Sequence, residues 1–187
     1  MQEFLKKQLK GKRVAIYFLL TNLVYALILT VTIPYVMRFS KGMKLFDLMP
    51  TGYDLSYTHK LLSTLGEPGR EAYLNYQIPL DMVYPFLFGF SYSLLLAYIL
   101  QKLGRFKRPF VFLCLVPIFA GLFDYFENLG IVTLLNAYPK LSNFLVQITS
   151  FATLIKSGLT TAYFLILLMV LVMLLMHKLI QKRSIKH

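Results

Sequence analysis

The chain has 187 residues, of which 57% are hydrophobic, with a formal net charge of +12 at pH 7 and a mean hydropathy of +0.62. This apolar fraction exceeds the about 45–50% that is usual for soluble domains, so the composition favours an integral membrane protein with a single domain over residues 1–187. The one cysteine, Cys114, excludes a disulfide framework and a cysteine-rich metal site.

Four apolar stretches are each long enough to cross a hydrocarbon core of about 30 Å as a helix of about 20 residues. They predict an all-α fold: a polytopic membrane protein built as a four-transmembrane-helix bundle. The first stretch follows a basic segment, but it is too long for a signal peptide and lacks an A-x-A cleavage site, so we expect an uncleaved anchor. The expected spans cover about 14–37, 80–101, 109–136 and 145–177.

Basic residues cluster at the ends of these stretches, where they act as topology signals rather than as a nucleic-acid-binding face. The N-terminal tail with Lys6 and Lys7, the 102–108 loop and the C-terminal tail with Lys186 are rich in Lys and Arg. Acidic residues nearly balance the basic ones between the first two spans. The positive-inside rule therefore predicts that both termini are cytoplasmic in a plasma membrane, and no nucleic-acid partner is expected.

The segment 38–79 between the first two spans carries helix signals of its own. Asp54 or Ser56 can cap a short helix, Gly66 can end that helix in the left-handed conformation, and Pro68 can begin a second one. This pattern predicts a short helical extracytoplasmic cap that lies on the outer membrane surface.

Three polar residues interrupt the third apolar stretch. Asp124, Glu127 and Asn128 occupy positions i, i+3 and i+4, so they share one side of their helix. At about 1.5 Å per residue, Asp124 lies roughly 22–24 Å along the helix from the basic boundary at Arg108. These acids are therefore predicted in the outer part of the membrane.

Two further charges fall in the same outer part of the membrane when the same counting is applied to their helices. Lys156 lies about 30–33 Å from Lys178, and Asp81 lies roughly 30 Å from Lys102. Ionisable residues inside a membrane are costly and are functional-site candidates by default. Their shared depth beneath the predicted cap therefore indicates one site.

One lysine cannot neutralise three acids. Either a second cation enters, which could be Arg70, a metal ion or a substrate amine, or an acid is protonated, or water reaches the site. A pairing of Lys156 with Asp124 or with Glu127 could also be purely structural, and the sequence leaves both partners open. No metal or cofactor is expected, because the chain has no metal-ligand spacing and no glycine-rich phosphate loop.

Three short motifs are similar to a pattern in small, uncharacterised bacterial four-span proteins. They are LGxxGRxxY over residues 65–73, DxxYP over residues 81–85 and DYxEN over residues 124–128, and the likeness runs from roughly Phe46 to Val170. The resemblance implies no known activity or cofactor. It implies only which positions to test: Arg70, Tyr73, Asp81, Tyr84, Pro85, Asp124, Glu127 and Asn128.

The leading hypothesis is that the protein binds, or binds and processes, a lipid or small amphiphile in an acidic, Tyr-rich pocket open to the outer leaflet. Asp124, Glu127 and Asp81 are the candidate catalytic residues. One alternative is a structural subunit of a membrane complex with an unidentified partner; another is a proton- or cation-coupled transporter. The expected ligand-binding residues are Asp81, Tyr84, Asp124, Glu127, Asn128, Lys156, Arg70 and Tyr73.

Overall fold

The computed structural model describes residues 9–184, within which the regular structure is helical and no strand forms. Four helical stretches of this part of the chain are long and apolar enough to cross a membrane. They confirm the all-α prediction and the four apolar stretches. The positions of Lys6, Lys7 and Lys186 in the predicted basic tails lie outside the described residues. The stretches are Gly11–Met37, Leu55–Lys102, Phe110–Ala137 and Asn143–Ile180.

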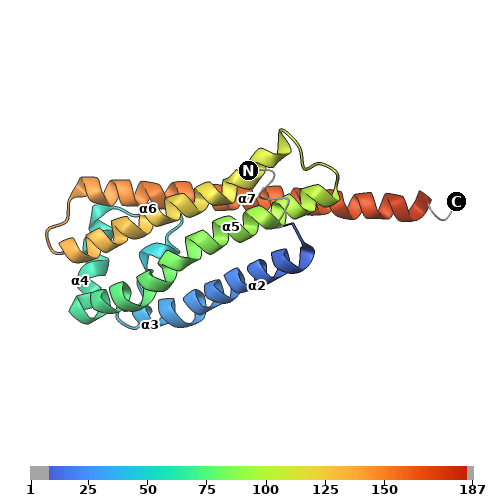
Figure 1. Ribbon diagram of the computed structural model, residues 1–187. Helices are drawn as coiled ribbons and strands as arrows, with labels where there is room; N and C mark the ends of the chain where they lie inside the picture. The colour runs from blue at the N-terminus through green and yellow to red at the C-terminus, as the bar shows by residue number, and fades with distance from the viewer. Residues whose placement is uncertain (1–8, 185–187) are drawn as a thin grey trace.

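The four long helices α2 (Gly11–Leu27), α5 (Ile78–Lys102), α6 (Val116–Ala137) and α7 (Asn143–Ser184) run lengthwise side by side (Figure 1). Helix α5 is central, since it packs against α2, α6 and α7. The outer surface of the bundle is apolar along every one of these helices, which suits contact with lipid. Examples of exposed side chains are Leu19, Phe86, Phe126 and Leu168.

Two π-helical turns widen the helices at one end of the bundle. The turn η1 (Ile28–Thr32) joins α2 to α3 (Ile33–Met37), and the turn η3 (Tyr73–Gln77) joins α4 to α5. Each turn closes just before a proline, Pro34 or Pro79. Proline has no backbone N–H for the regular helical ladder, and a wide turn is one way for the chain to pass it without ending the helix.

Helix α4 (Leu55–Ala72) contains the predicted break. The backbone N–H of Tyr57 donates to Asp54 Oδ1 at 2.7 Å, so Asp54 rather than Ser56 caps the helix. Gly66 has a φ of 63°, which kinks the helix where the sequence predicts its end. The second short helix is not separate, however, because it continues through η3 into α5. The helix that carries the second span therefore begins well before residue 80.

The third stretch also departs from the prediction, because residues Phe110–Leu115 form a 3₁₀ segment, η4, before α6 begins.

At the opposite end of the bundle the short 3₁₀ segment η2 (Phe46–Leu48) is anchored by burial, since Leu45 and Phe46 are fully buried. The backbone N–H of Tyr53 donates to Ser150 Oγ at 2.8 Å and ties the same segment to α7. Figure 1 places α3, α4 and the α6–α7 connection at this end. That this segment lies at the extracytoplasmic surface of the membrane stays a prediction.

Candidate functional site

An ion cluster joins α6 to α7. Lys156 Nζ lies 2.7 Å from Asp124 Oδ1 and 2.5 Å from Glu127 Oε2, so the lysine pairs with both acids rather than with one. Thr153 Oγ1 donates to the other oxygen of Glu127 at 2.7 Å. Glu127 is fully buried, and Asp124 and Thr153 are nearly so. Charges from two helices thus meet, as the counting along the helices indicated, while their depth in the membrane stays a prediction.

A proline and an asparagine lock α5 against α6. Pro85 has no N–H, so the carbonyl of Asp81, four residues earlier, loses its helical donor. Asn128 Nδ2 replaces it and donates to that carbonyl at 3.0 Å. The helices approach closely here, because a Cβ added to Gly121 would lie 2.6 Å from the carbonyl oxygen of Pro85. Asp81 is thereby fixed beside the ion cluster.

A fourth acid, Asp47, reaches the same region from η2. The hydroxyl of Tyr73 donates to Asp47 Oδ2, and Gln77 Nε2 lies 3.3 Å from Asp47 Oδ1 as a second donor. Thr32 donates in turn to Gln77 Oε1. The two π-helical turns, which contain Thr32, Tyr73 and Gln77, therefore hold Asp47 in place.

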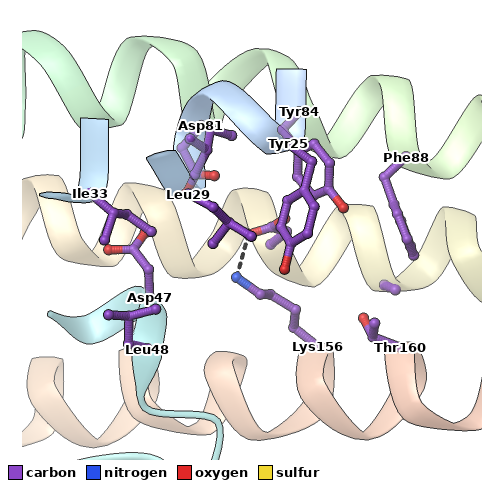
Figure 2. Close-up of a pocket in the computed structure, with 13 residues that line it drawn as sticks. Tyr25, Leu29, Ile33, Asp47, Leu48, Asp81, Tyr84, Phe88, Lys156 and Thr160 are labelled. Carbon is purple, nitrogen blue, oxygen red and sulfur yellow. Dashed lines mark hydrogen bonds and ion pairs between the residues drawn. The ribbon is translucent and has the colours of Figure 1, made fainter. Parts of the chain in front are cut away.

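These groups surround a cavity of about 160 Å³, into which side chains from every long helix point (Figure 2). Its mouth lies on the side of α2 and η1, where Tyr25 is 42% and Leu29 is 40% exposed. Three acids, Asp47, Asp81 and Asp124, line the cavity together with aromatic and aliphatic side chains. Its lining comprises Tyr25, Ile28, Leu29, Ile33, Asp47, Leu48, Asp81, Tyr84, Phe88, Ala120, Asp124, Lys156 and Thr160.

Four of the predicted site residues line the cavity: Asp81, Tyr84, Asp124 and Lys156. Glu127, Asn128 and Tyr73 stand behind it, where they hold Lys156, the backbone at Asp81, and Asp47 respectively.

Arg70 is not part of the site. Its Nη1 donates to the carbonyl of Leu62 at 3.0 Å, and its guanidinium carbon lies 4.6 Å from the ring centroid of Tyr138. Arg70 is therefore not the second cation that the sequence left open. It binds the C-terminal carbonyls of the first half of α4 across the kink.

Asp47 is the residue that sequence reasoning missed. In the sequence it is one acid among the mixed charges of the segment between the first two spans, and its spacing to other residues carries no signal. Only the burial of Leu45 and Phe46 brings its carboxylate to the cavity. One signal was present: Thr32 is a polar residue within the first apolar stretch, and it could have indicated a buried polar partner near that end of the span.

A second hollow continues the cavity along the bundle. It is an apolar groove of about 550 Å³ with α5 as its floor and α2 and α7 as its walls. Tyr25, Tyr84 and Thr160 line both the cavity and the groove, so the two hollows adjoin at these residues. Because a helix rises about 1.5 Å per residue, the groove extends about 22 Å from Tyr84 to Ile99. The other lining residues are Phe18, Asn22, Tyr92, Leu95, Phe164, Leu167 and Leu171.

Metal binding has no support from side-chain geometry. Among residues 9–184, no group of three His, Cys, Asp or Glu side chains is arranged to hold a metal ion. The ring centroid of His59 lies 5.4 Å from that of Tyr138.

Comparison of the chain with protein-family models, with curated proteins and with solved structures finds no match.

Proposed function

We propose that this protein is an integral membrane protein that binds an amphiphile, with the polar head in the acidic cavity and the apolar tail in the groove. The observation that carries the proposal is that the two hollows adjoin and share Tyr25, Tyr84 and Thr160 as lining residues. Charged groups and a long apolar surface are thus offered to a single ligand. In this proposal the protein lies in a bacterial plasma membrane with both termini in the cytoplasm.

The volumes support a division of the ligand between the hollows. A cavity of about 160 Å³ matches roughly five water molecules at about 30 Å³ each, so it accommodates a small head but no acyl chain. The groove of about 550 Å³ falls within the about 300–1,000 Å³ typical of small-molecule sites. Its tyrosine and phenylalanine rings offer a large apolar contact area at a modest cost in side-chain entropy.

The mouth of the cavity suits lateral entry. Tyr25 and Leu29 are exposed on the apolar outside of the bundle, where lipid would lie, rather than in a polar loop. An amphiphile could therefore enter from the bilayer without passing through water. This is the arrangement expected of a protein whose ligand is dissolved in the membrane.

A substitution that fills the place where the cavity adjoins the groove tests the proposal. Thr160→Phe places a ring where the cavity meets the groove, while Thr161→Phe makes the same change on the exposed side of α7 and serves as the control. Native mass spectrometry and lipidomics of the purified proteins should show the same bound amphiphile in the wild type and in Thr161→Phe, and at least tenfold less in Thr160→Phe. An unchanged complement in Thr160→Phe would contradict the proposal.

The ion cluster favours one alternative, a structural subunit in which Lys156, Asp124 and Glu127 hold the bundle together. That alternative predicts a stoichiometric membrane-protein partner and no bound amphiphile. The transporter alternative has less support, because α5 carries no charge from Met82 to Gln101 and α7 carries none from Ser157 to Met176. A proton or cation pathway through the inner half would need such groups.

A further inference from the structure

The charges around the cavity do not balance. Four carboxylates gather there, and Lys156 is the only described cation that pairs with any of them. Its two short contacts go to Asp124 and Glu127. Among the described side chains, those of residues 9–180, none forms an ion pair with Asp47 or Asp81. The side of the cavity that these two acids form is therefore the side where a further positive charge is missing.

Of the two acids without an ion pair, Asp81 gives the stronger evidence for a missing ligand. The residue is 6% exposed, and its Oδ2 is buried with no hydrogen-bond partner. Burying a carboxylate oxygen without a partner is costly, and native proteins seldom keep such a group without a role. The main-chain carbonyl of Asp81 is bound by Asn128, so the backbone cannot turn the side chain away from the cavity. Figure 2 shows the carboxylate of Asp81 directed into the hollow.

Asp47 faces the same hollow from η2, and its carboxyl group lies close to that of Asp81. Tyr73 and Gln77 occupy one acceptor position on each of its oxygens. A carboxylate has about four acceptor positions, so about two remain for a ligand in the cavity. The donors behind Asp47 fix its direction, and they leave the negative charge itself uncompensated, because a tyrosine hydroxyl and an amide are neutral.

The shape of the site selects the kind of cation. A divalent metal ion needs several oxygen ligands around it, and no described trio of acids is arranged that way. Lys156 also lines the cavity, and its ammonium would repel a divalent ion about twice as strongly as a monovalent one at the same distance. An organic ammonium spreads its interactions over three N–H donors and an apolar stem. The stacked rings of Tyr25 and Tyr84, with centroids 5.2 Å apart, line the same cavity and can attract such a cation.

We infer that the amphiphile has an organic ammonium head, which donates hydrogen bonds to Asp81 and Asp47 while the tail follows the groove away from Tyr84. The inference rests on the proposed function and names its ligand class: alkyl amines and lipids with a free amino head. A neutral alcohol head would leave Asp81 and Asp47 uncompensated, and an anionic head would add to an existing excess of negative charge.

The test compares heads on a constant tail. The full-length protein in a neutral maltoside detergent is titrated with dodecylamine, dodecanol and dodecyl phosphate, and binding is followed by native mass spectrometry. We expect dodecylamine to bind the wild type at least tenfold more tightly than the other two probes. Binding of dodecanol or dodecyl phosphate as tight as that of dodecylamine would overturn the inference and leave the proposed function standing. If none of the three probes binds, both fail.

Substitutions test whether Asp81 is the acid that binds the ammonium head. Asp81→Asn keeps the shape of the side chain and should weaken dodecylamine binding about tenfold or more, because a hydrogen bond to a charged group is lost or weakened. Glu71→Gln removes the same charge from an exposed acid of α4 and should leave binding unchanged. Equal dodecylamine affinity in Asp81→Asn and the wild type would also overturn the inference. The comparison of heads on the wild type decides the matter even if Asp81→Asn does not fold.

Discussion

Lys156→Met should destabilise the protein more than the simultaneous removal of all three charges of the ion cluster. The single change deletes the contacts of 2.7 Å and 2.5 Å to Asp124 and Glu127. It leaves two acids whose side chains are only 7% and 0% exposed, with Thr153 as a donor to Glu127. Breaking a buried ion pair from one side costs about 3–5 kcal/mol, because the remaining charge has no partner.

The triple variant Lys156→Met, Asp124→Asn, Glu127→Gln keeps the volumes and removes every charge of the cluster. Replacing a whole buried ion pair by neutral groups is often nearly neutral or stabilising. We therefore expect the triple variant to recover most of the loss. For a chain of this size about 1 kcal/mol corresponds to about 2–4 °C, so the single variant should melt about 6–20 °C below the wild type.

The chain provides its own reporter for this measurement. Cys114 is its only cysteine and is fully buried, so a thiol-reactive fluorophore reports unfolding as the temperature rises. Lys140→Met, which changes an exposed lysine in the α6–α7 connection, serves as the matched control and should melt with the wild type. A triple variant that melts at or below the temperature of Lys156→Met would refute the reasoning, since unpaired charge would then not be the cause.

Two further predictions concern the contact between α5 and α6. Asn128→Leu removes the donor to the Asp81 carbonyl and should cost about 1–3 kcal/mol in thermal or denaturant unfolding. The loss should be smaller in a Pro85→Ala background, because the backbone N–H of Ala at that position can reach the same carbonyl. Equal losses in both backgrounds would contradict the explanation. Gly121→Ala should cost about 1–3 kcal/mol, because its Cβ would lie 2.6 Å from a backbone oxygen. Gly158→Ala, whose Cβ would have no described neighbour within 4 Å beyond the backbone of its own helix, should be neutral or slightly stabilising. Equal melting temperatures of these two variants would count against the close approach of α5 and α6.

The parts of the fold that depend on local chemistry were predictable from the sequence. Apolar length gives the four stretches, the N-cap preference gives the start of α4 at Asp54, and the conformational freedom of glycine gives the kink at Gly66. Counting along helices also gives the common level of Asp124 and Lys156, because both measurements begin at basic boundaries at the ends of the helices.

What the sequence could not give depends on contacts between distant segments. The continuity of α4 with α5 requires a π-helical turn before Pro79, a position that sequence rules assign to a helix start. Asp47 reaches the cavity through Gln77 and through the burial of its neighbours, neither of which leaves a periodic signal. Arg70 failed as a site residue for the opposite reason, since a nearby main-chain carbonyl and an aromatic ring satisfy it locally.

The position of Lys156 on α7 bears on how the protein is made. A ribosome delivers the chain from its N-terminus, so α6 with Asp124 and Glu127 is synthesised before α7, which holds their positive partner. Asp124 and Glu127 must therefore wait for a counter-charge that arrives last, and the arrival of α7 both pairs them and completes the wall of the groove. A nascent chain that stops before α7 would keep its acids unpaired and would be a ready target for membrane quality control.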